Sequence, residues 1–132
     1  MKNENLIVEC NIISRSVFDK NVSKRENVFE KNIINSKNYC TKWFDYDKIG
    51  SMVFLRNQKN GDVLQIGKNG EHKKLNRFFI DKKIPREERG RIWILAKGPE
   101  VIWVINHRTS EGYRITDTTQ NFLQVTVKCT DD

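Results

Sequence analysis

The sequence predicts an α+β fold: mostly antiparallel strands in a layered sandwich, with a two-helix basic corner inserted midway. Short runs of β-branched and aromatic residues alternate with turn residues, and one segment has apolar residues at helical spacing. The chain has 132 residues, of which 37% are hydrophobic and 31% charged. That composition fits one globular domain with a core, and it excludes a disordered or fibrous chain.

The apolar runs are too short for a membrane protein. The longest, residues 92–96 and 101–105, have five residues each, whereas a spanning helix needs about twenty. Near the start, Leu6-Ile7-Val8 is followed at once by Glu9, which is too short for a secretory signal. We therefore expect a soluble, cytoplasmic protein that makes no membrane contact.

The first third of the chain predicts one strand and little else. Residues 6–13 are rich in β-branched side chains and read as a strand. Residues 14–42 are polar and give no clear assignment. We therefore divide the chain into a preceding segment, residues 1–42, and a main domain, residues 43–132.

Aromatic density returns in residues 43–49, and Gly50 marks a turn. Residues 52–56 and 62–66 then flank a five-residue connection that ends in Asn60-Gly61. Because Asn-Gly is favoured where φ must be positive, these two runs predict a β-hairpin.

The next segment predicts two short helices. Leu75, Phe78 and Phe79 share one side of a helical wheel, and Lys73, Lys74 and Arg77 share the other. Lys82 would enter the apolar side, so we expect this helix to end near Ile80 or Asp81. Pro85 suits the first turn of a second helix that runs to about Arg91.

The last third predicts strands again. Residues 92–96 and 101–106 flank a four-residue turn, and the second run is apolar on both faces, as in a central strand. Residues 113–116 predict a short strand, and residues 122–128 a longer one in which Leu123, Val125 and Val127 alternate. We expect the three tryptophans, Trp43, Trp93 and Trp103, to lie in the core.

Positive charge is concentrated in the helical segment. The net charge is +7, and residues 68–91 hold nine Lys and Arg against four Asp and Glu. A cluster of this kind on a basic domain is typical of a surface that binds a polyanion such as nucleic acid.

No catalytic or metal site is indicated. The seven glycines form neither Gly-x-Gly-x-x-Gly nor a phosphate-binding Walker loop. The three cysteines are far apart, and His72 and His107 have no cysteine nearby, so the ligand spacings of a zinc site are missing. We expect no catalytic residue, metal or cofactor.

One long motif is distinctive in its order and spacing. Residues 73–89 read KKLNRFFIDKKIPREER; residues 44–49 read FDYDKI before them, and residues 102–104 (IWV) and 108–111 (RTSE) follow. From about Trp43 to Lys128 the chain resembles the C-terminal domain family of tRNA(Ile)-lysidine synthase. It departs from that family at three turn positions: Gln65 and Ile92 stand where Pro is common, and Asn106 where Gly is common.

The resemblance implies a domain fold related to part of the phenylalanyl-tRNA synthetase β subunit. It also implies a parent enzyme that ligates lysine to the wobble cytidine of tRNA(Ile), with ATP and lysine as substrates. The ATP-binding loop of the catalytic N-terminal domain is missing from this sequence, so the chain itself is expected to be non-catalytic. Its partners would be tRNA(Ile) with a CAU anticodon, gripped near the acceptor stem, and that catalytic domain; a dimer is left open.

The predicted RNA-binding residues are the cations of the helical corner and two later arginines: Lys73, Lys74, Arg77, Lys82, Lys83, Arg86, Arg89, Arg108 and Arg114. Phosphate contacts by such residues give affinity and register rather than sequence selectivity. The alternative is a protein-interaction or intramolecular scaffold domain whose basic corner docks acidic residues and makes no direct contact with RNA.

Overall fold

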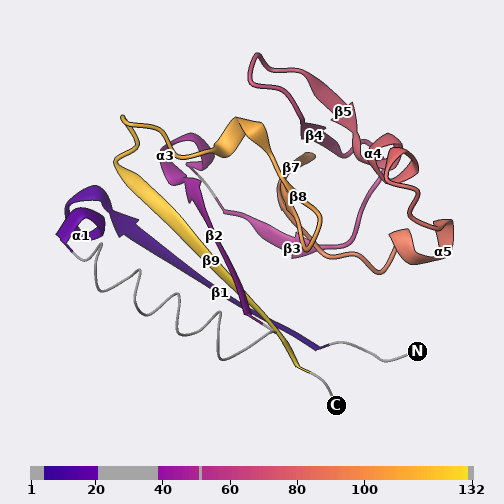
Figure 1. The fold of residues 1–132 in the computed structure, drawn as a ribbon, viewed down its shortest axis with the longest axis horizontal. Helices are drawn as coiled ribbons and strands as arrows, with labels where there is room; N and C mark the ends of the chain where they lie inside the picture. Colours follow the sequence, from indigo (N-terminus) through magenta and orange to yellow (C-terminus); the bar gives the residue numbers. More distant parts are fainter. Residues whose placement is uncertain (1–4, 21–38, 51, 131–132) are drawn as a thin grey trace. The chain divides into compact units, whose positions relative to one another are not determined.

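The computed structural model describes residues 5–20, 39–50 and 52–130, and Figure 1 traces the chain. Its contacts divide the chain into two compact units, Met1–Lys48 with Ile115–Asp132, and Ile49–Arg114. We call the first the terminal unit and the second the central unit. The predicted boundary between residues 42 and 43 falls inside a strand, Tyr39–Asp45, so the compact units do not follow it.

The described part of the terminal unit forms a three-stranded antiparallel sheet. Its middle strand, β9 (Asn121–Thr130), pairs with β1 (Asn5–Ser14) on one side and β2 (Tyr39–Asp45) on the other. The predicted strands at residues 6–13 and 122–128 are therefore confirmed. The alternation in β9 is also confirmed, because Leu123, Val125 and Val127 are buried.

Hydrogen bonds fix the connections of the terminal unit. The short helix α1 (Arg15–Lys20) follows β1, and the Arg15 guanidinium donates to the carbonyls of Thr119 (2.6 Å) and Thr116 (3.0 Å). At the end of β2, the buried Asp45 accepts a hydrogen bond from the Thr119 hydroxyl at 2.9 Å. One helical turn, α3 (Tyr46–Ile49), comes next along the chain.

The described part of the central unit contains a mixed sheet of six short strands. Along the sheet lie β3 (Phe54–Arg56), β6 (Ile94–Lys97), β7 (Glu100–Val104), β4 (Val63–Gln65) and β5 (His72–Lys74). The two-residue strand β8 (Arg108–Thr109) also pairs with β7. Only the pairing of β4 with β7 is parallel. The predicted hairpin of residues 92–106 is confirmed as β6 and β7, and all of Val101–Val104 is buried, as expected of a central strand.

Two helices complete the central unit. β5 leads directly into α4 (Leu75–Asp81), and α5 (Arg86–Arg89) follows after a short connection (Figure 1). Leu75, Phe78 and Phe79 are buried against the sheet, so the predicted apolar face and the helix end at Asp81 are confirmed. The core cluster that they join consists of Leu64, Leu75, Phe78, Phe79, Ile84, Ile94, Ala96, Val101 and Val104.

Three local predictions were wrong. Residues 52–56 and 62–66 do not form a hairpin, because β3 pairs with β6 while β4 pairs with β5 and β7. Lys73 and Lys74 lie in strand β5 rather than in the first helix. Residues 113–116 are not a strand; a 3₁₀ turn, η1 (Glu111–Tyr113), ends at Tyr113, and the Ser110 hydroxyl caps its start by accepting the Gly112 N–H at 3.0 Å.

The α+β class with mostly antiparallel strands and a two-helix corner is thus confirmed. The unassigned residues 21–38 lie outside the described part. Among the described residues, no helix combines the length and the apolar character needed to cross a bilayer.

A candidate nucleic-acid interface

The central unit carries the whole net charge of the protein. Residues 49–114 contain fourteen Lys and Arg against seven Asp and Glu, a net +7, while the residues of the terminal unit balance to zero. A charge imbalance confined to one compact unit creates a positive potential there, which attracts polyanions. The candidate interface therefore belongs to the central unit.

The link between α4 and α5 projects two adjacent lysines. The Lys83 N–H donates to the Ile80 carbonyl at 2.9 Å, and the Ile84 N–H donates to the Phe79 carbonyl at 3.0 Å. This pair of bonds is the Schellman ending of a helix, in which the residue at the position of Lys83 adopts a left-handed conformation and is usually glycine. Lys83 has φ +59°, so a charged residue occupies a position where its backbone is strained.

Two of the predicted cations are already neutralised. Lys73 Nζ lies 2.6 Å from one carboxylate oxygen of Asp81, and Arg77 Nε lies 3.2 Å from the other. The Lys73 hydrogen bond, with the charges of both cations, lowers the pKa of Asp81 below its usual value. Because an ion-paired cation offers less charge to a phosphate, Lys73 and Arg77 are the weaker candidates.

Three predicted arginines already have partners in the central unit. The Arg89 Nε donates to the Ile84 carbonyl at 3.0 Å, and the Arg108 guanidinium donates to the Ile66 carbonyl at 2.9 Å. Arg114 pairs with Glu111 at 3.0 Å, and this bond lowers the pKa of the Glu111 carboxyl. These residues add positive potential, but their donors are partly used.

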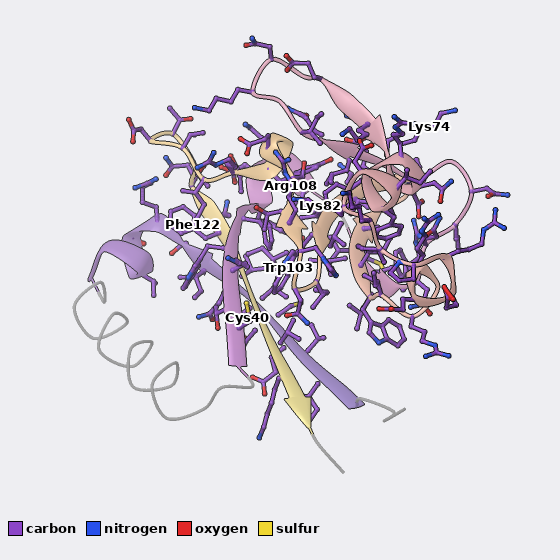
Figure 2. All side chains as sticks on the ribbon, turned by 45° about the vertical axis from the view of Figure 1, so that its right-hand side comes forward. Cys40, Lys74, Lys82, Trp103, Arg108 and Phe122 are labelled. Atoms are coloured by element: carbon purple, nitrogen blue, oxygen red, sulfur yellow. The ribbon has the colours of Figure 1, made fainter. Side chains whose placement is uncertain are left out.

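Four predicted cations have no carboxylate within 4.0 Å in the described part of the chain: Lys74, Lys82, Lys83 and Arg86. All four are exposed. Figure 2 labels Lys74, at the end of β5, together with Lys82 and Arg108. We call Lys74, Lys82, Lys83 and Arg86 the unpaired cations; they lie at the start of α4, at its end and in α5.

Lys82 also lies over an aromatic ring of its own helix. Its ammonium lies 5.9 Å from the centre of the Phe78 ring, a cation–π distance. Burial and, secondarily, the charge of Lys82 lower the pKa of His107.

The prediction that all three tryptophans lie in the core was wrong for Trp93. Trp103 is 1% exposed, as predicted for the core, but Trp93 is 36% exposed. Trp93 directly precedes β6 in an apolar run, and that run gave no sign that the strand would begin one residue later. Its exposure is therefore a property of the fold rather than of the local sequence.

No metal centre was found in the described residues. No group of three or more His, Cys, Asp or Glu side chains within them is arranged to hold a metal ion. The buried Asp62 is bound by the Arg56 guanidinium at 2.8 and 2.9 Å and by the Lys59 N–H at 2.7 Å, a structural arrangement. What the central unit offers chemically is a set of donors for anionic oxygens.

Sequence comparisons find relatives that share one name. A "tRNA(Ile)-lysidine synthase" of Caldanaerobacter subterraneus is 41% identical over 91 residues, which cover 68% of this chain and 19% of that protein. The protein of the same name from Clostridium acetobutylicum is 32% identical over 129 residues, covering 88% of this chain and 28% of the relative. The chain thus spans between about a fifth and somewhat over a quarter of these curated relatives.

Two solved structures share the fold. A crystal structure of the TilS C-terminal domain superposes with a TM-score of 0.57 and 22% identity, covering 72% of each chain. An N-terminal fragment of the phenylalanyl-tRNA synthetase β subunit from Pyrococcus horikoshii gives a TM-score of 0.61 and 15% identity, covering 92% of this chain and 39% of the other. The expected relation of the fold to these two proteins is confirmed.

A sequence profile of the TilS substrate C-terminal domain family matches residues 53–125, more than half of the chain. The match includes all nine predicted RNA-binding residues and the whole α4–α5 corner. The chain therefore belongs to the TilS substrate C-terminal domain family.

Proposed function

We propose that this chain is the tRNA-binding C-terminal domain of a tRNA(Ile)-lysidine synthase and grips the acceptor-stem region of the tRNA. The observation that carries the proposal is the set of unpaired cations Lys74, Lys82, Lys83 and Arg86, all exposed on a unit of net charge +7. The names of the relatives point to the same substrate class, since they are synthases of a modified tRNA.

The proposed recognition is by backbone and shape. An A-form RNA stem has a deep, narrow major groove that side chains do not read, so its phosphates and 2′-hydroxyls are the accessible features. Lysine and arginine donate charge-assisted hydrogen bonds to phosphate oxygens. Such contacts fix the position of the stem while carrying little information about its sequence.

In this proposal the reaction itself belongs to the catalytic N-terminal domain of the parent protein. That domain would use ATP to join lysine to the wobble cytidine of the tRNA with a CAU anticodon. The present chain would contribute affinity and register for the tRNA, in the cytoplasm, without touching ATP or lysine.

A comparison of two polyanions tests the proposal. Binding of the 132-residue chain to a tRNA(Ile) transcript and to polyglutamate is measured by fluorescence anisotropy in moderate salt. We expect clear preference for the tRNA, because a folded RNA presents phosphates in a fixed spacing and polyglutamate does not. Equal or tighter binding of polyglutamate would instead favour a domain that docks acidic protein segments.

Matched variants locate the interface. Lys82→Gln with Lys83→Gln should weaken tRNA binding about tenfold or more, since phosphate contacts dominate affinity. Lys42→Gln with Lys48→Gln removes the same charge from exposed positions of the neutral terminal unit and should have little effect. Equal losses in the two variants would mean that net charge alone, rather than the corner, determines binding.

A further inference from the structure

The central unit exposes one tryptophan, four residues after the end of α5. Trp93 is 36% exposed, whereas Trp103 in the same unit is 1% exposed. Within the described residues, no aromatic ring stacks on the Trp93 indole, no cation lies over it and no acceptor binds its N–H. Because a tryptophan that serves only packing is usually buried with its N–H bonded, the exposure of Trp93 makes this side chain a candidate for contact with a ligand.

Trp93 lies close along the chain to the helices of the proposed RNA surface. It follows α5 closely, and the Ile92 N–H donates to the Arg89 carbonyl at 3.4 Å. Its own carbonyl accepts the Ile105 N–H at 3.0 Å, which places it beside the end of β7 and the turn at Asn106 and His107. Residues 86–91 carry three arginines against two glutamates, so Trp93 closely follows a segment of net positive charge.

We propose that Trp93 is a stacking platform for an unpaired nucleobase next to the RNA stem that the unpaired cations grip. Every base has a π-face, so stacking on an exposed indole is tolerant of sequence, and single-strand binders combine such platforms with a cationic backbone path. A base inside a duplex is already stacked on its neighbours, whereas an unpaired terminal base is not. The ligand class is therefore an RNA stem with a single-stranded extension.

This inference rests on the proposed RNA-binding function. Stacking of one base is worth about fivefold to a hundredfold in affinity, by the energies of base–aromatic contacts. That gain should appear only when an unpaired base is present, whereas contacts to phosphates of the stem should appear with or without one.

The test uses two RNA hairpins that share one stem, the first blunt and the second with a four-nucleotide 3′ extension. We expect the 132-residue chain to bind the extended hairpin at least about fivefold more tightly. Trp93→Ala should abolish this difference while leaving binding of the blunt hairpin unchanged. Trp93→Phe should keep most of the difference, because phenylalanine retains an aromatic face.

Phe54 provides a matched control, since it is another aromatic residue of the central unit and is 54% exposed on β3. Phe54→Ala should not change the preference for the extended hairpin. Quenching of tryptophan fluorescence by the extension should occur in the wild-type chain and in Phe54→Ala, and should be absent in Trp93→Phe.

Each other outcome overturns the inference in a recognisable way. If the chain binds both hairpins equally, or if Trp93→Ala weakens both equally, Trp93 is structural rather than a base platform. If the wild-type chain binds neither hairpin, the proposed function itself fails. Thermal melts of the variants by circular dichroism separate loss of stacking from loss of fold.

Discussion

Lys83 combines a strained backbone with an exposed positive charge. Its backbone has φ +59° at the end of α4, and an L residue in the left-handed region costs about 1 kcal/mol relative to its preferred regions. The next residue, Ile84, is buried and donates its N–H to the Phe79 carbonyl at 3.0 Å. These contacts fix the turn, so the backbone of Lys83 keeps its strained conformation. The strained position suits glycine best, and the lysine there adds an exposed positive charge to the corner.

Replacing Lys83 should therefore separate stability from binding. Lys83→Gly removes the strain, and after allowing for the larger unfolded-state entropy of glycine we expect a gain of up to about 0.5 kcal/mol in the free energy of unfolding. RNA affinity should fall several-fold, because one phosphate contact is lost. Urea unfolding and an RNA-binding titration measure the two quantities on the same sample.

Asn106→Gly is the matched control for this prediction. Asn106 also has positive φ, at +68°, but it carries no charge. Its replacement should give a smaller gain in stability, since asparagine tolerates the left-handed region, and no change in RNA affinity. A loss of affinity in both variants would show that backbone stiffness, not the Lys83 charge, matters for binding.

At the scale of elements, Asp81 controls how much charge the corner displays. This carboxylate ends α4 and pairs with Lys73 on β5 and Arg77 one turn earlier in α4. It thus joins helix to strand and masks two cations at once. Surface pairs of this kind contribute little to stability, so their effect on the electrostatic potential matters more.

Asp81→Asn should strengthen RNA binding. With the carboxylate gone, Lys73 and Arg77 become available to phosphates, and the slope of log affinity against log salt should steepen by up to about one to two. Binding titrations at several salt concentrations measure both changes. Weaker binding by a folded Asp81→Asn variant would show that the Asp81 pairs position the interface rather than mask it.

The same carboxylate gives a pH test with a defined sign. The Lys73 hydrogen bond lowers the folded-state pKa of Asp81 below its ordinary value of 3.8. Its contribution to stability is therefore fully present above that ordinary value and is lost as the pH falls through the folded-state pKa. The difference in unfolding free energy between wild type and Asp81→Asn should narrow over this acidic range, and a constant difference would contradict the assigned pairing.

Elements were predictable where a local pattern determined them. The apolar side of α4 and the apolar run of β7 identified their elements, because each buries its own repeating face. The hairpin expected at residues 52–66 failed for the opposite reason. Its turn is real, since Gly61 has φ +90°, but the strands on either side of it find their partners in β6 and β7, far along the chain.

The candidate site was predictable in composition but not in charge pairing. The sequence identified nine cations, and the fold divides them into paired, structural and unpaired residues. Nothing in the local pattern indicates that Asp81 reaches back to Lys73, or that Arg108 bonds to the Ile66 carbonyl. The exposure of Trp93 depends in the same way on where β6 begins.

For the whole molecule, the important feature is the separation of charge between the two units. The terminal unit is neutral and the central unit carries +7, although the terminal unit contributes ten of the Lys and Arg residues. Net charge per unit became visible only when the structure assigned residues 115–132 to the same unit as the start of the chain.

The salt dependence of RNA binding tests the central claim most directly. If Lys74, Lys82, Lys83 and Arg86 each neutralise one phosphate, log affinity should fall against log salt with a slope of about −3 to −4. Lys82→Gln with Lys83→Gln should reduce the magnitude of that slope by about half, while Lys42→Gln with Lys48→Gln should leave it unchanged. A flat salt response, or a slope that the corner variant does not alter, would contradict the account.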